Sequence, residues 1–201
     1  MNFVKEGTNT RKYSLTLTPD EELVLTEQAM LNDMNIEAYI KAMLVDATQQ
    51  STRTIAYVDG TYSEKLERYG YGVVIRQNGK CWKYSGSASD KDMVSMNSVA
   101  GEICAATIAI KWALSHRIPS IDIYYDYSGI EHWVTGVWKA NEVGTKRYRD
   151  FAKNATNIID IKFHKVKAHT GIPDNEEADR LAALAIRDFI DKGVSYHEYA
   201  Y

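Results

Sequence analysis

Cysteine is scarce in this sequence of 201 residues, and long hydrophobic runs are absent from it. The two cysteines, Cys81 and Cys104, form neither a disulfide framework nor the spacing of a metal site, which is typical of a protein in a reducing compartment. No stretch approaches the roughly 18 to 20 consecutive apolar residues that cross a membrane. Residues 1–7 lack the apolar core of a secretory signal. We therefore expect a cytoplasmic protein without a membrane span.

A strong excess of basic charge is also missing. The chain carries 24 Lys and Arg against 27 Asp and Glu, a formal net charge of −3. Residues 1–50 hold four basic and eight acidic side chains, whereas the rest of the chain holds 20 and 19. Neither part has the basic surface of a tight, general nucleic-acid binder. Binding to a nucleic acid would depend on local basic patches or on bound cations.

The first 50 residues predict a strand followed by two helices. Residues 12–17 alternate polar and apolar side chains, which is typical of a half-buried strand. Thr18 and Glu21 have the spacing of a capping box, so a helix is expected from Pro19 to about residue 31. Asn35 can cap a second helix with one apolar face. These elements are too few to bury their apolar faces alone.

This order resembles the ribbon–helix–helix family over residues 11–47. The resemblance implies a homodimer in which the strands of two chains pair and four helices interlock. It places Tyr13, Leu15 and Leu17 toward the dimer core, with the outward positions occupied by Lys12, Ser14 and Thr16. In many members of that family the outward residues read DNA. Because this segment is acidic, two interpretations stay open, dimerisation alone and dimerisation with contact to duplex DNA.

The polar residues 46–53 separate this segment from a differently organised region. We expect a dimerisation segment over residues 1–50, a larger domain over residues 53–192 and a tail over residues 193–201, to which the sequence assigns no role. The larger domain shows strand patterns at 54–59, 71–76, 80–85, 121–125 and 159–166, and helix patterns at 99–115 and 174–190. Asn78-Gly79 is a strong hairpin signal. This order predicts an α/β fold with a mixed sheet flanked by helices.

Four acidic residues of this domain stand where a charge is not normally hidden. Asp59 and Asp126 end strand patterns, and Glu102 and Asp179 lie at the front of helix patterns. Ionised carboxylates are rarely buried unless they are paired or bound to metal, so the four together suggest one metal-binding cluster. Each alone has an ordinary explanation. Asp59 could form a turn, and Asp179 could pair with Arg180 or favour its helix dipole.

The motifs around these acids resemble the type 1 ribonuclease H family over about residues 53–190. They are Tyr57-Val58-Asp59-Gly60-Thr61, Ala100-Gly101-Glu102, Tyr125-Asp126-Tyr127-Ser128-Gly129, Val166-Lys167-Ala168-His169 and Asn175-Glu176-Glu177-Ala178-Asp179. The motifs look similar to those of the bacterial branch related to the viroplasmin-associated enzymes. The resemblance implies a five-stranded mixed sheet and cleavage of the RNA strand of RNA–DNA hybrids.

Hydrolysis of a phosphodiester explains the need for carboxylates. Two Mg²⁺ ions can activate water and stabilise the departing oxygen, and Mg²⁺ prefers oxygen ligands; Mn²⁺ can substitute. Asp59 is the best candidate to bridge both ions. Glu102 and Asp126 would complete the coordination shell of one ion, and Asp179 that of the other. Which outer carboxylate serves which ion stays open. By similarity, His169 lies on a loop and assists proton transfer or product release.

The candidate substrate contacts follow from the same resemblance, since type 1 enzymes grip the minor groove and read 2′-hydroxyls. They are Gly60, Thr61, Asn97, Ser98 and Asn175. Ser98 stands where related enzymes usually carry Asn. A second candidate group is the basic patch Lys139, Lys146, Arg147, Arg149 and Lys153, near Trp133 and Trp138. Contact with phosphates is one interpretation of this patch, and a solvated helix face is the other.

The sequence thus predicts an endoribonuclease on RNA–DNA hybrids that releases 5′-phosphate and 3′-hydroxyl ends. Two alternatives remain. One is a DNA-binding regulator whose second domain only recognises a nucleic acid, and the other is a nuclease that processes DNA on the same fold.

Overall fold

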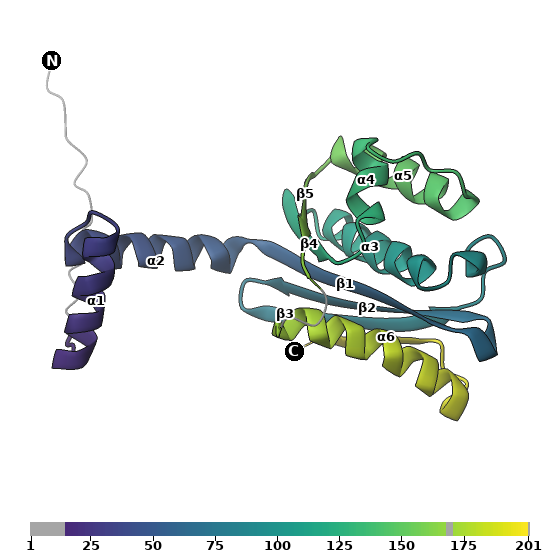
Figure 1. The fold of residues 1–201 in the computed structure, drawn as a ribbon, viewed down its shortest axis with the longest axis horizontal. Helices are drawn as coiled ribbons and strands as arrows, with labels where there is room; N and C mark the ends of the chain where they lie inside the picture. The colour runs from purple at the N-terminus through teal and green to yellow at the C-terminus, as the bar shows by residue number, and fades with distance from the viewer. Residues whose placement is uncertain (1–14, 168–170, 201) are drawn as a thin grey trace, which may run out of the picture. The chain divides into compact units, whose positions relative to one another are not determined.

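The computed structural model describes residues 15–167 and 171–200, with the backbone alone at residues 45–52 and 197–200 (Figure 1). It divides into two compact units, residues 1–49 and residues 50–201. Each unit is described by itself.

The first unit contains the helix α1 (Pro19–Leu31) and most of α2 (Ile36–Thr52). The capping box predicted at the start of α1 is present. The Glu21 backbone N–H donates to Thr18 Oγ1 (3.4 Å), and the Thr18 backbone N–H donates to the Glu21 carboxylate (2.8 Å). Asn35 Oδ1 accepts the N–H of Ala38 at 2.8 Å at the start of α2. Both predicted helix starts are therefore confirmed.

The strand expected at residues 12–17 is not settled by the structure. Lys12, Tyr13 and Ser14 lie outside the described residues, and Leu15, Thr16 and Leu17 form no strand. A strand of this kind would pair with the same strand of a second chain, so it stays a prediction.

The second unit is built on one mixed sheet of six strands in the order β5-β4-β1-β2-β3-β6. Their bounds are β1 (Thr54–Ser63), β2 (Arg68–Gln77), β3 (Lys80–Ala88), β4 (Ser120–Tyr125), β5 (Asp160–Lys165) and β6 (Tyr196–Ala200). The strands β1, β4 and β5 run parallel, whereas β2, β3 and β6 pair antiparallel. The five-stranded mixed sheet expected from the family resemblance is present as β5 to β3, and β6 extends it by one strand.

Helices cover both faces of this sheet (Figure 1). One face carries α3 (Ser98–Ser115), α4 (Gly129–Thr135) and α5 (Val143–Thr156), and the other carries α6 (Pro173–Lys192). The main core lies between the sheet and α3, where Ala105 and Ile110 pack with Val58 and Ile123. Among the described residues α3 is the one helix long and apolar enough to cross a membrane, and its burial in this core accounts for that composition.

Two local predictions have different outcomes. The hairpin at Asn78-Gly79 is confirmed, since β2 and β3 flank it and both residues have positive φ (49° and 75°). The first strand was predicted to end at Asp59, and this boundary is wrong, because β1 continues to Ser63 and pairs with β2 throughout. Gly60 therefore lies within the strand.

The tail at residues 193–201, to which the sequence analysis assigns no structure, contributes the edge strand β6. Gly193 ends α6 in the left-handed conformation (φ 69°) and turns the chain back. The Ser87 N–H then donates to the Ser195 carbonyl at 2.9 Å, and β6 pairs with β3 from Gly86 to Trp82. The tail therefore covers the hydrogen-bonding edge of β3.

Candidate active site

The candidate site lies where the central strands β1 and β4 separate. Their parallel pairing ends at Tyr57 with Tyr124, but β1 continues beyond this pair while β4 stops at Tyr125. Asp59 follows two residues after Tyr57, and Asp126 follows directly after β4. The end of β4 therefore leaves room beside Asp59 at one end of the sheet, as is common for ligand sites in α/β folds.

Two glycines bring the front of α3 against this part of β1. A Cβ on Gly60 would lie 2.2 Å from the backbone nitrogen of Glu102, and a Cβ on Gly101 would lie 2.1 Å from the carbonyl oxygen of Gly70. Only hydrogen at both positions allows this approach of helix and strand. As a result Glu102, the fifth residue of α3, reaches the space beside Asp59.

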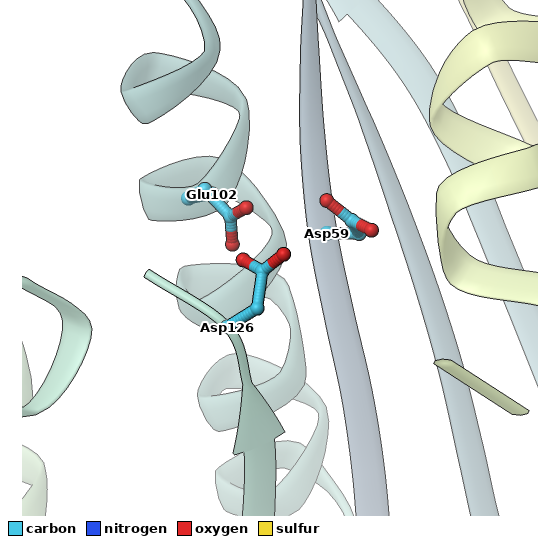
Figure 2. A group of neighbouring side chains, drawn as sticks. All are labelled: Asp59, Glu102 and Asp126. Atoms are coloured by element: carbon cyan, nitrogen blue, oxygen red, sulfur yellow. The ribbon is translucent and has the colours of Figure 1, made fainter. Parts of the chain in front are cut away.

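The carboxyl groups of Asp59, Glu102 and Asp126 point toward a common space (Figure 2). Ligand oxygens of the three all lie within 4.8 Å of one another. They line a pocket of about 400 Å³ together with Gly60, Ser98, Tyr127, Asn175, Glu176 and Asp179. Glu102 is 4% exposed, which is unusual for an acid without a cationic partner.

Asp179 reaches the same pocket from the opposite face of the sheet. Gly72, which pairs with Asp59, allows α6 to lie close, because a Cβ there would be 2.0 Å from the carbonyl oxygen of Ala178. Asp179 lines the pocket but lies outside the close group of three. Arg180, a suggested partner of Asp179, binds Glu177 at 2.7 and 2.8 Å. The pocket thus collects all four of the predicted carboxylates.

Burial and mutual repulsion raise the pKa of two of these acids. The pKa of Asp59 rises to about 6, first because burial penalises its charge and then because of the charge of Asp126. The pKa of Glu102 lies well above its usual range, for the same reason of burial and because of the charges of Asp59 and Asp126. Without a cation the cluster therefore resists full ionisation.

The donor set fits divalent cations of the Mg²⁺ type. Carboxylate oxygens are hard ligands, and three of them converge in a partly enclosed pocket. Two buried oxygen atoms of the same pocket, Glu102 Oε2 and Asn175 Oδ1, have no hydrogen-bond donor in the described structure. Buried polar atoms normally have a partner, so a cation or its bound water would satisfy them.

The remaining predicted residues lie at different distances from the pocket. Gly60, Ser98 and Asn175 line it. Asn97 directly precedes α3 with a positive φ of 55°, and Thr61 continues β1 past Gly60. His169 lies outside the described residues, so its proposed role stays a prediction.

The five residues of the predicted basic patch do not line one hollow. Lys139, Arg149 and Lys153 line a hollow of about 380 Å³ with Trp138, which is 41% exposed. Arg147 pairs with Asp92 at 2.8 Å and lines another hollow, between α3 and α5. Lys146 is exposed on α5. Three of the five basic side chains therefore share one hollow, whereas Arg147 lines a different one.

The sequence interpretation overlooked Tyr127 and Glu176, both of which line the carboxylate pocket. Burial and the charge of Glu102 raise the pKa of Tyr127, which keeps its hydroxyl protonated. Glu176 accepts the backbone N–H of Gly171 at 3.1 Å. Position directly after Asp126 was the one signal that could have indicated Tyr127.

Comparisons with known proteins agree with this geometry. The family model described as RNase H matches residues 50–187. A ribonuclease H of Bartonella tribocorum is 32% identical over 160 residues, which cover 73% of this chain and 97% of the relative. The crystal structure of RNase H1 from Halobacterium salinarum has a TM-score of 0.52 at 24% identity and covers 68% of this chain and 98% of its own. LC11-RNase H1, solved with an RNA/DNA hybrid, has a TM-score of 0.50 at 16% identity, with 67% and 99% covered.

Proposed function

The chain belongs to the ribonuclease H family, and from this membership we propose that it is a nuclease that hydrolyses the RNA strand of RNA–DNA hybrids internally. The observation that carries the proposal is the convergence of Asp59, Glu102 and Asp126 in one pocket, with Asp179 on its wall. A related fold has been solved with an RNA/DNA hybrid, which supports the same substrate here.

The cofactor proposed for this site is a pair of Mg²⁺ ions, for which Mn²⁺ can substitute. Two such ions would activate the attacking water and stabilise the departing 3′ oxygen. Asp59 is proposed to bridge them, because it lies between Asp126 and Glu102 on one side and α6 on the other. Glu102 and Asp126 would then hold one ion, and Asp179 the other.

Water adds to phosphorus in this reaction and the bond to the 3′ oxygen breaks, which leaves a 5′-phosphate and a 3′-hydroxyl. The departing oxygen must take up a proton. We assign the proton transfer, or the release of product, to His169, on the strength of the family resemblance alone.

Substrate contacts are proposed on both sides of the pocket. Ser98 and Asn175 carry donors in its lining, and Gly60, Thr61 and Asn97 lie next to them. The RNA strand would meet these residues through its backbone and 2′-hydroxyls. The hollow with Lys139, Arg149 and Lys153 is proposed to bind phosphates.

The first unit is proposed to join two chains. In its described side chains one apolar residue, Ala29, is buried, whereas many large apolar side chains are exposed. Helices that cannot form a core alone need a partner, and a second copy of the segment at residues 11–47 would supply it. Contact of its ribbon with duplex DNA is a further proposal. We also propose a cytoplasmic location, since the two cysteines are free.

The proposed function is tested by offering the protein three substrates with Mg²⁺. Wild type and Asp59→Asn are incubated with labelled RNA–DNA hybrid, RNA duplex and DNA duplex. We expect the wild type to cut the RNA strand of the hybrid alone, and Asp59→Asn to lose at least about 100-fold in rate, because a metal ligand is removed. Cleavage of the DNA duplex would favour the DNA-processing alternative. Tight binding to one duplex sequence without cleavage would favour the regulator.

A further inference from the structure

We propose that Tyr127 is a substrate-contacting residue that donates a hydrogen bond to a phosphate oxygen next to the bond that is cut. The inference rests on the proposed function and adds a residue to it. Tyr127 directly follows Asp126 and lines the pocket that contains the carboxylates. It is partly exposed, so its side chain is accessible to a bound strand.

The lining of the pocket is short of hydrogen-bond donors. Five of its nine residues carry carboxylates, namely Asp59, Glu102, Asp126, Glu176 and Asp179. Ionised carboxylates only accept hydrogen bonds, and the oxygens of a phosphodiester also only accept. The N–H of Gly60 is already donated to Asp59 Oδ1 at 2.7 Å. Side-chain donors therefore remain at Ser98, Asn175 and Tyr127, and a phosphate held here must use them or bound cations.

Neighbouring residues fix the position of the Tyr127 ring. A Cβ on Gly129 would lie 2.4 Å from Cε1 of Tyr127, so glycine at the start of α4 allows the ring to pack there. The ring also contacts Trp133 and Trp138, with centroid distances of 5.7 and 6.2 Å. A side chain supported on several sides loses little freedom when it binds a ligand.

The hydroxyl of Tyr127 differs from that of Tyr125 in its hydrogen bonding. No hydrogen bond to it is present in the described parts of the chain, whereas the neighbouring Tyr125 hydroxyl donates to Glu131. A neutral donor also suits the electrostatics of the pocket, because a further anionic side chain there would repel the phosphate. A lysine would pair with the carboxylates and compete with the cations.

Tyr127→Phe removes the hydroxyl and keeps the ring. For the full-length protein acting on a labelled hybrid in Mg²⁺, we expect KM to rise about five-fold with kcat nearly unchanged, which corresponds to one neutral hydrogen bond. Tyr127→Ala should raise KM further, since this substitution removes the ring as well as the hydroxyl. Tyr125→Phe is the matched control. It removes a hydroxyl two residues away that lies outside the pocket lining, and we expect it to leave KM at the wild-type value.

The phosphate partner is identified with hybrids that carry one methylphosphonate at each position flanking the cleavage site. At one position the methylphosphonate should raise the KM of the wild type about five-fold. At the same position it should not raise the KM of Tyr127→Phe further, because the contact is already absent. Wild-type KM in Tyr127→Phe, or additive losses at every position, would overturn the proposal. So would a fall in kcat that parallels a fall in melting temperature, which is the mark of a structural role. An intact hybrid with the wild type would instead refute the proposed function.

Discussion

The ionisation of Asp59 and Glu102 links the site to the stability of the fold. Both pKa values are raised in the folded chain, so the folded state holds more protons than the unfolded state between the ordinary carboxyl pKa and the raised value. Because the state that binds more protons is favoured at low pH, the contribution of these acids to stability must fall as the pH rises. For Asp59 the window runs from its usual value, 3.8, to about 6.

We predict that the metal-free protein melts at a lower temperature at pH 7 than at pH 5, and that Asp59→Asn reduces this difference. The amide cannot ionise, so it removes the charge that burial and Asp126 oppose. Circular dichroism melts in a chelator at both pH values measure the effect. Equal pH dependence in the two proteins would contradict it.

Divalent cations provide the complementary measurement. Mg²⁺ should raise the melting temperature of the wild type at pH 7 by screening the cluster, and it should raise that of Asp59→Asn much less. Asp160→Asn is a suitable control, because this exposed acid lies on β5, away from the pocket lining.

The sequence could predict the four acids as a group, but it could not predict all of their neighbours. Each acid alone is an ordinary turn or helix-dipole residue, and the four stand out because they occur together in the ordered motifs that resemble one family. Tyr127 is not conspicuous, since an aromatic residue after a strand usually belongs to the core. Its place in the pocket depends on Gly129 and two tryptophans that pack the ring.

At the scale of elements, the contact of α3 with β1 depends on the absence of a side chain at Gly60. We predict that Gly60→Ala lowers stability by about 3 kcal/mol, because the new Cβ would meet backbone atoms that can move only with the helix. Displacement of Glu102 should also reduce the cleavage rate about ten-fold or more. Chemical denaturation and cleavage assays test both effects.

Gly144→Ala is the matched control for this substitution. Its Cβ would meet Sδ of Met93 and Cε of Met96 at 2.3 Å, which are ends of flexible side chains that can move aside. We expect a cost of about 1 kcal/mol and near-normal cleavage. A Gly60→Ala protein as stable as Gly144→Ala would contradict the packing argument.

The strand β6 gives the second prediction at this scale. Deletion of residues 194–201 removes the five residues paired with β3 and exposes its edge, so we expect a loss of about 2 kcal/mol and more aggregation on heating. Cleavage should persist at low temperature, because the pocket is built from β1, α3, β4 and α6. Calorimetry with light scattering measures these effects. Deletion of residue 201 alone, which follows β6, should change neither.

Local signals explain which elements were predictable. The capping box of α1 and the Asn78-Gly79 hairpin depend on residues three or fewer positions apart, and the structure contains both. The course of β1 past Asp59 depends on pairing with β2, and β6 depends on β3, more than 100 residues earlier in the chain. Periodicity over a short window indicates which side of a strand is buried but not which strand it pairs with, so it reveals neither pairing.

At the scale of the whole molecule, the first unit is the part that bears on the oligomeric state of the protein. Its exposed large apolar side chains are Leu15, Leu23, Val24, Met30, Leu31, Met34, Met43 and Leu44. Leu17, Val24 and Leu25 also line a hollow on α1, beside the acidic Asp20 and Glu21. So much apolar surface on so short a segment is typical of a protein interface.

We predict that the full-length protein is a dimer and that the double substitution Leu23→Glu, Leu44→Glu makes it monomeric. Two buried charges at an apolar interface cost far more than the same charges in water. Sedimentation equilibrium measures the mass. Ile158→Glu is the control, since Ile158 is also exposed (72%) but belongs to the second unit. A wild-type monomer would contradict the prediction.

Dimerisation should matter most on long hybrids. A dimer can hold one long hybrid at two sites, and the second contact then gains from the high effective concentration of a tethered site. We expect the monomeric variant to lose up to about 100-fold in affinity for a hybrid long enough to reach both sites, and little for a short one. Fluorescence anisotropy in the Asp59→Asn background measures binding without cleavage. Since the chain has a net charge of only −3 and no basic excess, two-point attachment would compensate for weak attraction to the phosphates at each site. Equal losses on long and short hybrids would show that the first unit acts on each site directly and not by joining two of them.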